Sequence, residues 1–119
     1  MVKKILLVIK NPPYGSGRAA EGLRVATAMI AMDVLPEILF IDDGVYCLLK
    51  YQKPEAAGLK SFGDRLKTLS DLVGLKASSD SLSQRHLEQA DISEDYEFKA
   101  LAPREIADLF SQNEAVITF

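Results

Sequence analysis

The chain has 119 residues, of which 48% are hydrophobic and 26% charged, and its formal net charge is −3. This length and composition fit one globular domain covering residues 1–119, with a single core. The acidic balance argues against direct binding to nucleic acid or to an anionic membrane surface, because no basic surplus is present to neutralise phosphates. No apolar run has membrane-spanning length and no secretory signal pattern is present, so we expect a cytoplasmic protein.

The sequence offers few side chains for sulfur or metal chemistry. It contains one cysteine, Cys47, and one histidine, His86. An internal disulfide therefore cannot form, and two soft ligands are too few for a zinc site. We expect neither a metal nor a cofactor.

The N-terminal part of the chain predicts a buried strand, an irregular loop and a helix. Residues 5–9 are continuously apolar, which suits a strand buried on both faces. Residues 11–17 contain two prolines and two glycines, so they cannot continue a strand or a helix. From about Arg18, apolar residues recur at helical spacing. The loop therefore follows the carboxyl end of a strand, where α/β proteins place ligands and chemistry.

The remainder of the chain continues this alternation. Four further segments predict strands, of which 75–78 is weak and short, and apolar residues at three- and four-residue steps predict three further helices. The predicted strands are 37–41, 75–78, 97–101 and 115–119, and the predicted helices are 55–73, 80–89 and one starting at Pro103. The alternation predicts an α/β fold, a three-layer α/β/α sandwich with a five-stranded, mostly parallel sheet that is flavodoxin-like in outline.

Two of these helices carry finer predictions. We expect Ser79 or Asp80 to cap the helix 80–89, since short polar side chains accept hydrogen bonds from the first free N–H groups of a helix. In the last helix we expect the apolar residues to face inward, namely Ile106, Leu109 and Phe110.

The segment 45–49 is too apolar for an exposed loop and predicts a short buried helix or turn. Its apolar content also indicates a subunit interface. Cys47 within it is either a small buried hydrophobe or a thiolate nucleophile. The neighbouring Asp42 and Asp43 should raise the pKa of its thiol, which favours the structural interpretation.

Two loops at the carboxyl edge of the predicted sheet are candidates for a ligand-binding or interface site. Residues 15–20 formally match the G-x-G-x-x-G/A dinucleotide fingerprint, but five residues separate Gly15 from the strand, which disfavours that function. A small anion held at the helix N-terminus by Pro12–Gly17 is the remaining ligand hypothesis. The candidate residues are Asn11, Pro12, Tyr14, Gly15 and Gly17 in the first loop and Asp42, Asp43 and Gly44 in the second.

An ordered series of segments resembles the DsrE/DsrF-like family, and within it the TusC/DsrF branch. The resemblance covers nearly the whole chain. The segments that carry it are Asn11-Pro12-Pro13-Tyr14-Gly15, Glu21-Gly22-Leu23, Phe40-Ile41-Asp42-Asp43-Gly44-Val45, Leu48-Leu49, Gln52-Lys53-Pro54 and Val116-Ile117-Thr118-Phe119.

This resemblance implies a small α/β domain that assembles into trimers or hexamers of like or related subunits. It also implies a role in sulfur relay, in which a persulfide sulfur is accepted from a small sulfur-carrier protein and passed on for tRNA thiolation or sulfur oxidation. In the sulfur-carrying subunit, the acceptor is a cysteine after the third strand, within a pattern resembling C-x-x-A-x-x-R-G.

The sequence departs from the family at the acceptor position. Ser78 stands at or beside the family's cysteine, while Arg85 matches its arginine. A serine hydroxyl cannot carry a persulfide, because that chemistry needs a thiolate. We therefore predict a non-catalytic subunit among related subunits. A sulfur carrier that uses Cys47 is the alternative.

Overall fold

The computed structural model of the chain describes residues 4–15, 17–49, 62–93 and 97–119. Its centre is a five-stranded sheet in the order β4-β3-β2-β1-β5, and every neighbouring pair is parallel. The strands are β1 (Ile5–Ile9), β2 (Glu37–Phe40), β3 (Leu75–Ser78), β4 (Lys99–Leu101) and β5 (Ala115–Thr118). The α-helices are α1 (Arg18–Ala31), α2 (Phe62–Ser70), α3 (Ser79–Gln84) and α4 (Pro103–Gln112), and 3₁₀ helices cover Asp42–Leu48 and Gln89–Asp91.

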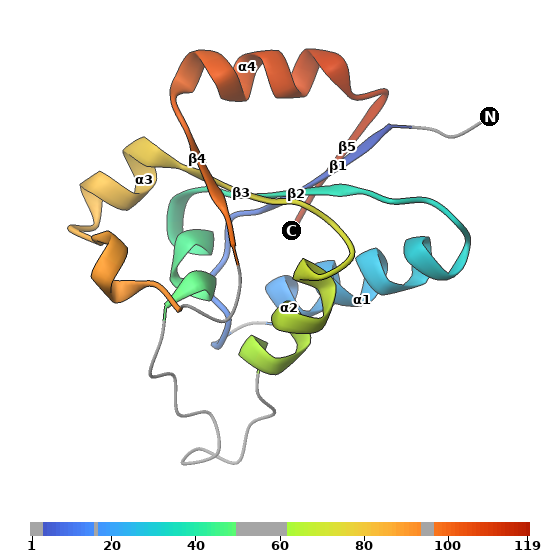
Figure 1. Cartoon of the computed structure of the whole chain (residues 1–119), viewed down its shortest axis with the longest axis horizontal. Coiled ribbons are helices and arrows are strands. Elements are labelled where there is room, and N and C mark those ends of the chain that lie inside the picture. Colours follow the sequence, from blue (N-terminus) through green and yellow to red (C-terminus); the bar gives the residue numbers. More distant parts are fainter. Residues whose placement is uncertain (1–3, 16, 50–61, 94–96) are drawn as a thin grey trace.

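Helices lie on both faces of the sheet, with α1 and α2 on one side and α4 on the other (Figure 1). The handedness of parallel crossovers explains this placement. The chain steps in one direction from β1 to β4, so right-handed connections place α1 and α2 on one face. The connection from β4 to β5 runs back across the whole sheet, which places α4 on the opposite face. The predicted three-layer α/β/α sandwich is confirmed, and its sheet is wholly parallel.

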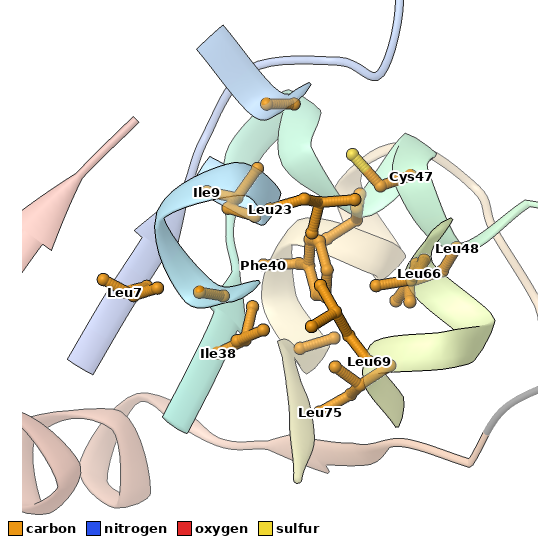
Figure 2. Close-up of a cluster of buried hydrophobic side chains, with 14 of the residues drawn as sticks. Leu7, Ile9, Leu23, Ile38, Phe40, Cys47, Leu48, Leu66, Leu69 and Leu75 are labelled. Carbon is orange, nitrogen blue, oxygen red and sulfur yellow. The ribbon is translucent and has the colours of Figure 1, made fainter. Parts of the chain in front are cut away.

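The larger part of the core lies between the sheet and the helices α1 and α2. Figure 2 shows Phe40 of β2 near the middle of this cluster, with Leu23 of α1 and Leu66 of α2 beside it. The opposite face of the sheet packs its own cluster under α4: Leu6, Val8, Leu39, Leu101 and Leu109. Successive residues of β1 thus belong to different clusters, which explains why that strand is apolar without alternation.

The strands follow the predictions closely, and the differences concern one strand and two helices. The strand predicted at 97–101 is limited to Lys99–Leu101. The helix predicted at 80–89 is α3, which spans only Ser79–Gln84, and its N-cap is Ser78 instead of Ser79 or Asp80. The helix predicted at 55–73 is α2, which spans Phe62–Ser70 in the described residues and so ends three residues before the predicted end. Its predicted first residues, 55–61, lie outside the described part of the chain.

Helix α3 is short because a left-handed residue stops it. His86 has a φ of 55°, and the N–H of Leu87 donates to the carbonyl of Leu82 over 2.9 Å. The N–H of His86 also donates to the carbonyl of Ser83. These two bonds form a Schellman motif, with histidine in the place that glycine usually fills.

The inward orientation predicted for Phe110 is wrong, since its side chain is 40% exposed. Leu109 is buried against the sheet and Ile106 is half-buried. Successive helical residues differ by about 100° around the axis, so Phe110 is turned to the flank of α4. Within the described residues, no helix is long and apolar enough to cross a membrane.

Candidate functional site

Three segments meet at the carboxyl edge of the sheet, where β1, β2 and β3 end. They are the loop after β1, of which residues 11–15 and 17 are described, the 3₁₀ helix Asp42–Leu48 and helix α3. In Figure 1, the last two lie together at one end of the sheet. The candidate residues predicted from the sequence, in the loops after β1 and β2, lie at this edge.

Gly44 fixes the 3₁₀ helix against the end of β1. A Cβ atom at this position would lie 1.9 Å from the carbonyl oxygen of Ile9. Asp42 enters the turn with a φ of 51°, and the N–H of Gly44 donates to the carbonyl of Ile41. The backbone can approach β1 this closely only because Gly44 has no side chain.

A chain of hydrogen bonds connects the ends of β2 and β3. The N–H of Ser81 donates to Oγ of Ser78 over 3.1 Å, which caps α3. The N–H of Asp42 donates in turn to Oγ of Ser81 over 2.9 Å. Both serines are buried, so their hydroxyl groups satisfy backbone donors that have little access to water. Ser78 therefore serves as the N-cap of α3.

Arg85 adds an ion pair across the same contact. Its Nε donates to Oδ1 of Asp43 over 3.1 Å, and Nη1 donates to the carbonyl of Ser81 over 3.3 Å. Asp43 is more than half exposed, so solvent screens the pair and its contribution to stability is small. The ion pair instead fixes the position of the end of α3 against the 3₁₀ helix.

Cys47 is fully buried in the core between the sheet and α1, and burial raises the pKa of its thiol well above the ordinary range. Its Sγ donates to the carbonyl of Asn11 over 3.8 Å. The sequence predicts that Asp42 and Asp43 raise this pKa. The structure instead assigns the shift to desolvation, since both aspartates are exposed and water screens their charges.

The interface predicted from the apolar segment 45–49 has another explanation. Val45, Cys47 and Leu48 are fully buried in the core of their own domain. These apolar side chains therefore pack in the core of the domain and do not form the surface patch from which an interface was predicted.

The loop after β1 combines a half-buried beginning with an exposed end. Asn11, Pro12 and Tyr14 are half-buried, whereas Gly15 and Gly17 are exposed. A cavity of about 420 Å³ opens beside the N-terminus of α1, and it is lined by Gly17, Arg18, Glu21, Thr118 and Phe119. The predicted ligand role of this loop remains a prediction. Among the described residues, no three His, Cys, Asp or Glu side chains gather where they could hold a metal ion.

The two loop glycines allow a matched test of backbone strain. Gly15 has a φ of 104°, and a Cβ would meet no atom within 4 Å at either Gly15 or Gly17. We expect Gly15→Ala to lower the free energy of unfolding by about 1 kcal/mol, because an L-residue is strained at this φ. Gly17→Ala should change it much less. Urea denaturation of both variants checks the difference, and equal stabilities would show that the loop relaxes around the new side chain.

A wholly parallel five-stranded sheet with polar side chains gathered beyond β2 and β3 defines a small α/β protein whose site lies at the carboxyl edge. The chain belongs to the DsrE/DsrF-like family, which it matches over residues 3–119. The resemblance read from the sequence is thereby confirmed.

Two relatives match over essentially their whole length. The intracellular sulfur oxidation protein DsrF of Allochromatium vinosum is 31% identical over 133 aligned residues, covering 100% of this chain and 98% of that protein. A TusC homolog of Vibrio parahaemolyticus is 30% identical over 120 residues, covering 99% of this chain and 100% of that protein.

Two solved structures share the fold. The crystal structure of the ychN protein from E. coli has a TM-score of 0.80 at 22% identity, covering 99% of this chain and 100% of that one. A protein of unknown function from Methanobacterium thermoautotrophicum has a TM-score of 0.74 at 14% identity, covering 98% of this chain and 99% of that one. At these identities the likeness establishes the fold alone.

Proposed function

We propose that this chain is a non-catalytic subunit of a sulfur-relay assembly of the DsrE/DsrF type in the cytoplasm. Its partners are related DsrE-like subunits, in a trimer or hexamer, and a small sulfur-carrier protein. Full-length similarity to a sulfur oxidation protein and to a TusC homolog supports the relay role. The absence of a usable thiol supports the non-catalytic part.

The observation that carries the proposal is the role of Ser78. Ser78 is 7% exposed at the end of β3, and its hydroxyl oxygen accepts a hydrogen bond from the N–H of Ser81. In the family resemblance, this is where the sulfur-accepting cysteine belongs. A hydroxyl in that place can cap the helix but cannot hold a sulfane sulfur. The chain keeps the local framework of the site without its nucleophile.

The alternative carrier, Cys47, lacks the properties of an acceptor. Sulfur transfer requires a thiolate that attacks the terminal sulfur of the donor persulfide, and the donor leaves as a thiolate. The Cys47 thiol is buried and its pKa is raised, so it is protonated at neutral pH and hidden from a donor. Both properties follow from burial, and both oppose the reaction.

A small-anion site at the first loop is the second candidate function. The cavity beside the N-terminus of α1 supports it, because Gly17 and Arg18 both line that space. Calorimetric titration with inorganic phosphate tests it directly. Saturable heat that disappears in the Arg18→Glu variant would support an anion site.

The sulfur-relay proposal predicts that the native chain stays unlabelled. Incubated with a persulfide donor and a sulfurtransferase, it should gain no sulfur atom by mass spectrometry, because its single thiol is buried and protonated. The same protein unfolded in urea should be labelled at Cys47, which shows that the reagents work. Labelling of the native chain as fast as that of the unfolded chain would make Cys47 a carrier.

A further inference from the structure

The two edges of the sheet differ in how they are protected. At one edge, β4 is three residues long and carries the exposed Lys99, a common device against unwanted strand pairing. At the other edge, all four residues of β5 are exposed and uncharged. Val116 and Ile117 within it are 40% and 39% exposed. An unprotected apolar edge of this kind is a template for pairing with another strand.

Along β5, every second residue directs its backbone N–H and C=O groups away from the sheet. The N–H of Ala115 donates to the carbonyl of Lys4, and the N–H of Phe119 donates to the carbonyl of Val8. The backbone N–H and C=O groups of alternate residues of β5 therefore point toward β1, the neighbouring strand in Figure 1. The N–H and C=O groups of Val116 and Thr118 consequently point outward, away from the sheet. They form four bonding groups on the open edge.

We propose that this edge pairs with the same edge of a second copy of this chain, antiparallel about a two-fold axis at Ile117. In this register, Val116 lies opposite the partner's Thr118 and Thr118 lies opposite the partner's Val116. The four outward N–H and C=O groups of each chain then bond to the four of its partner, which gives four hydrogen bonds across the interface. The two sheets join into one sheet of ten strands.

The side chains and charges around the edge suit a second copy. Ile117 of each chain meets the partner's Ile117 in a non-hydrogen-bonded pair, where side chains approach most closely. Glu114 lies beside Lys4 in the ladder, and its N–H donates to that residue's carbonyl. In the pair, Glu114 also falls in the same row as the partner's Lys10, about 10 Å away between Cα atoms. The pairing thus brings the partner's Lys10 toward Glu114, and no charges of like sign face each other along the paired strands.

The interface is small, so the pairing is expected to be at the weak end of specific association. It does not depend on the proposed sulfur-relay role, and either proposal can fail without the other. It also leaves the rest of the surface free for related subunits.

A charge-swap experiment at the two-fold axis tests the proposal. Ile117→Lys and Ile117→Glu should each abolish the pairing, because two like charges face each other at the centre. An equimolar mixture of the two variants should restore it through opposite charges. Ala100→Lys, an exposed position on β4 at the opposite edge, is the matched control and should leave the wild-type mass unchanged. Sedimentation over a range of concentrations measures all four samples, and melting curves show that each variant folds.

Crosslinking provides a second readout. Cα atoms of a non-hydrogen-bonded antiparallel pair lie about 4.5 Å apart, which a disulfide can span. Ile117→Cys should form a covalent dimer with oxidised glutathione, and Val116→Cys and Thr118→Cys should do so far less. Rescue by the mixture and crosslinking at Ile117→Cys would establish the pairing. An unchanged mass for Ile117→Lys, no rescue by the mixture, or equal crosslinking at the three positions would each overturn it.

Discussion

Gly44→Ala is expected to destabilise the domain more than the same substitution at any other glycine whose surroundings the structure describes. The new Cβ would lie 1.9 Å from the carbonyl oxygen of Ile9, with Lys10 Cα at 3.2 Å. Real Cβ atoms do not approach backbone oxygen so closely, and the neighbour is main chain of the central strand β1, which cannot rotate away. The 3₁₀ helix must therefore move as a unit.

This movement would reach the contacts that the helix makes with the rest of the site. Asp42 would lose its hydrogen bond to Ser81, and Val45 and Leu48 would leave a closely packed core. We expect the free energy of unfolding to fall by about 3 kcal/mol or more. The melting temperature should drop by about 10 °C or more.

Gly74→Ala is the matched control. A Cβ there would meet only the end of the Lys76 side chain, at 3.6 Å, and that flexible group can move. We expect its melting temperature to stay close to that of the wild type, as measured by circular dichroism. A Gly44→Ala variant as stable as Gly74→Ala would mean that the 3₁₀ helix can shift freely, and that its position does not define the site.

The sheet could be predicted from the sequence because each central strand is buried on both faces. Residues 5–9 have the predicted bounds, since an apolar run flanked by turn residues leaves little choice. Residues 75–78 also have the predicted bounds, although Lys76 and Ser78 make their pattern weak. The order of the strands could not be predicted. It depends on the direction in which each crossover steps, and only the packed structure records that direction.

The site was less predictable than the sheet, for a reason visible in its contacts. Asp42 and Ser81 are 39 residues apart, and Asp43 and Arg85 are 42 residues apart. No local sequence pattern predicts contacts between residues so far apart in the chain. Ser78 was singled out only through the family resemblance, and its capping role depends on the residue at which β3 ends. Helix ends are decided by single hydrogen bonds, so a shift of one or two residues is the usual error.

Ser78→Cys is expected to give the chain the sulfur-accepting capacity that the wild type lacks. The substitution places a thiol at the end of β3, where the family resemblance locates the acceptor. The N–H of Ser81, which now donates to the hydroxyl, would face the sulfur and favour the thiolate. Loss of the serine cap should cost about 1 kcal/mol, which the domain can tolerate.

The expected gain follows from the difference between two thiols. An unperturbed thiol with a pKa near 8.5 is a few per cent thiolate at neutral pH, and each unit by which the pKa rises reduces that fraction about tenfold. Burial raises the pKa of Cys47 well above this value. Position 78 is also largely buried, but the N–H of Ser81 points at it and opposes such a rise. We therefore expect the Ser78→Cys variant to gain sulfur at least about tenfold faster than the wild type, measured by mass spectrometry. The double variant with Cys47→Ala should be labelled equally fast, which assigns the sulfur to position 78.

Position and exposure can be separated with a second cysteine on the same helix. Ser83 is exposed on α3, away from the end of β3, so Ser83→Cys supplies an accessible thiol outside the proposed acceptor position. A small-molecule persulfide should label both variants, since both thiols can ionise. A carrier protein that docks on this edge of the sheet should label Ser78→Cys and largely spare Ser83→Cys, because transfer between proteins requires the two sulfur atoms to meet in one geometry. Equal labelling by the carrier protein would mean that the edge retains no docking function, and the chain would then be a structural member of its family without a place in sulfur transfer.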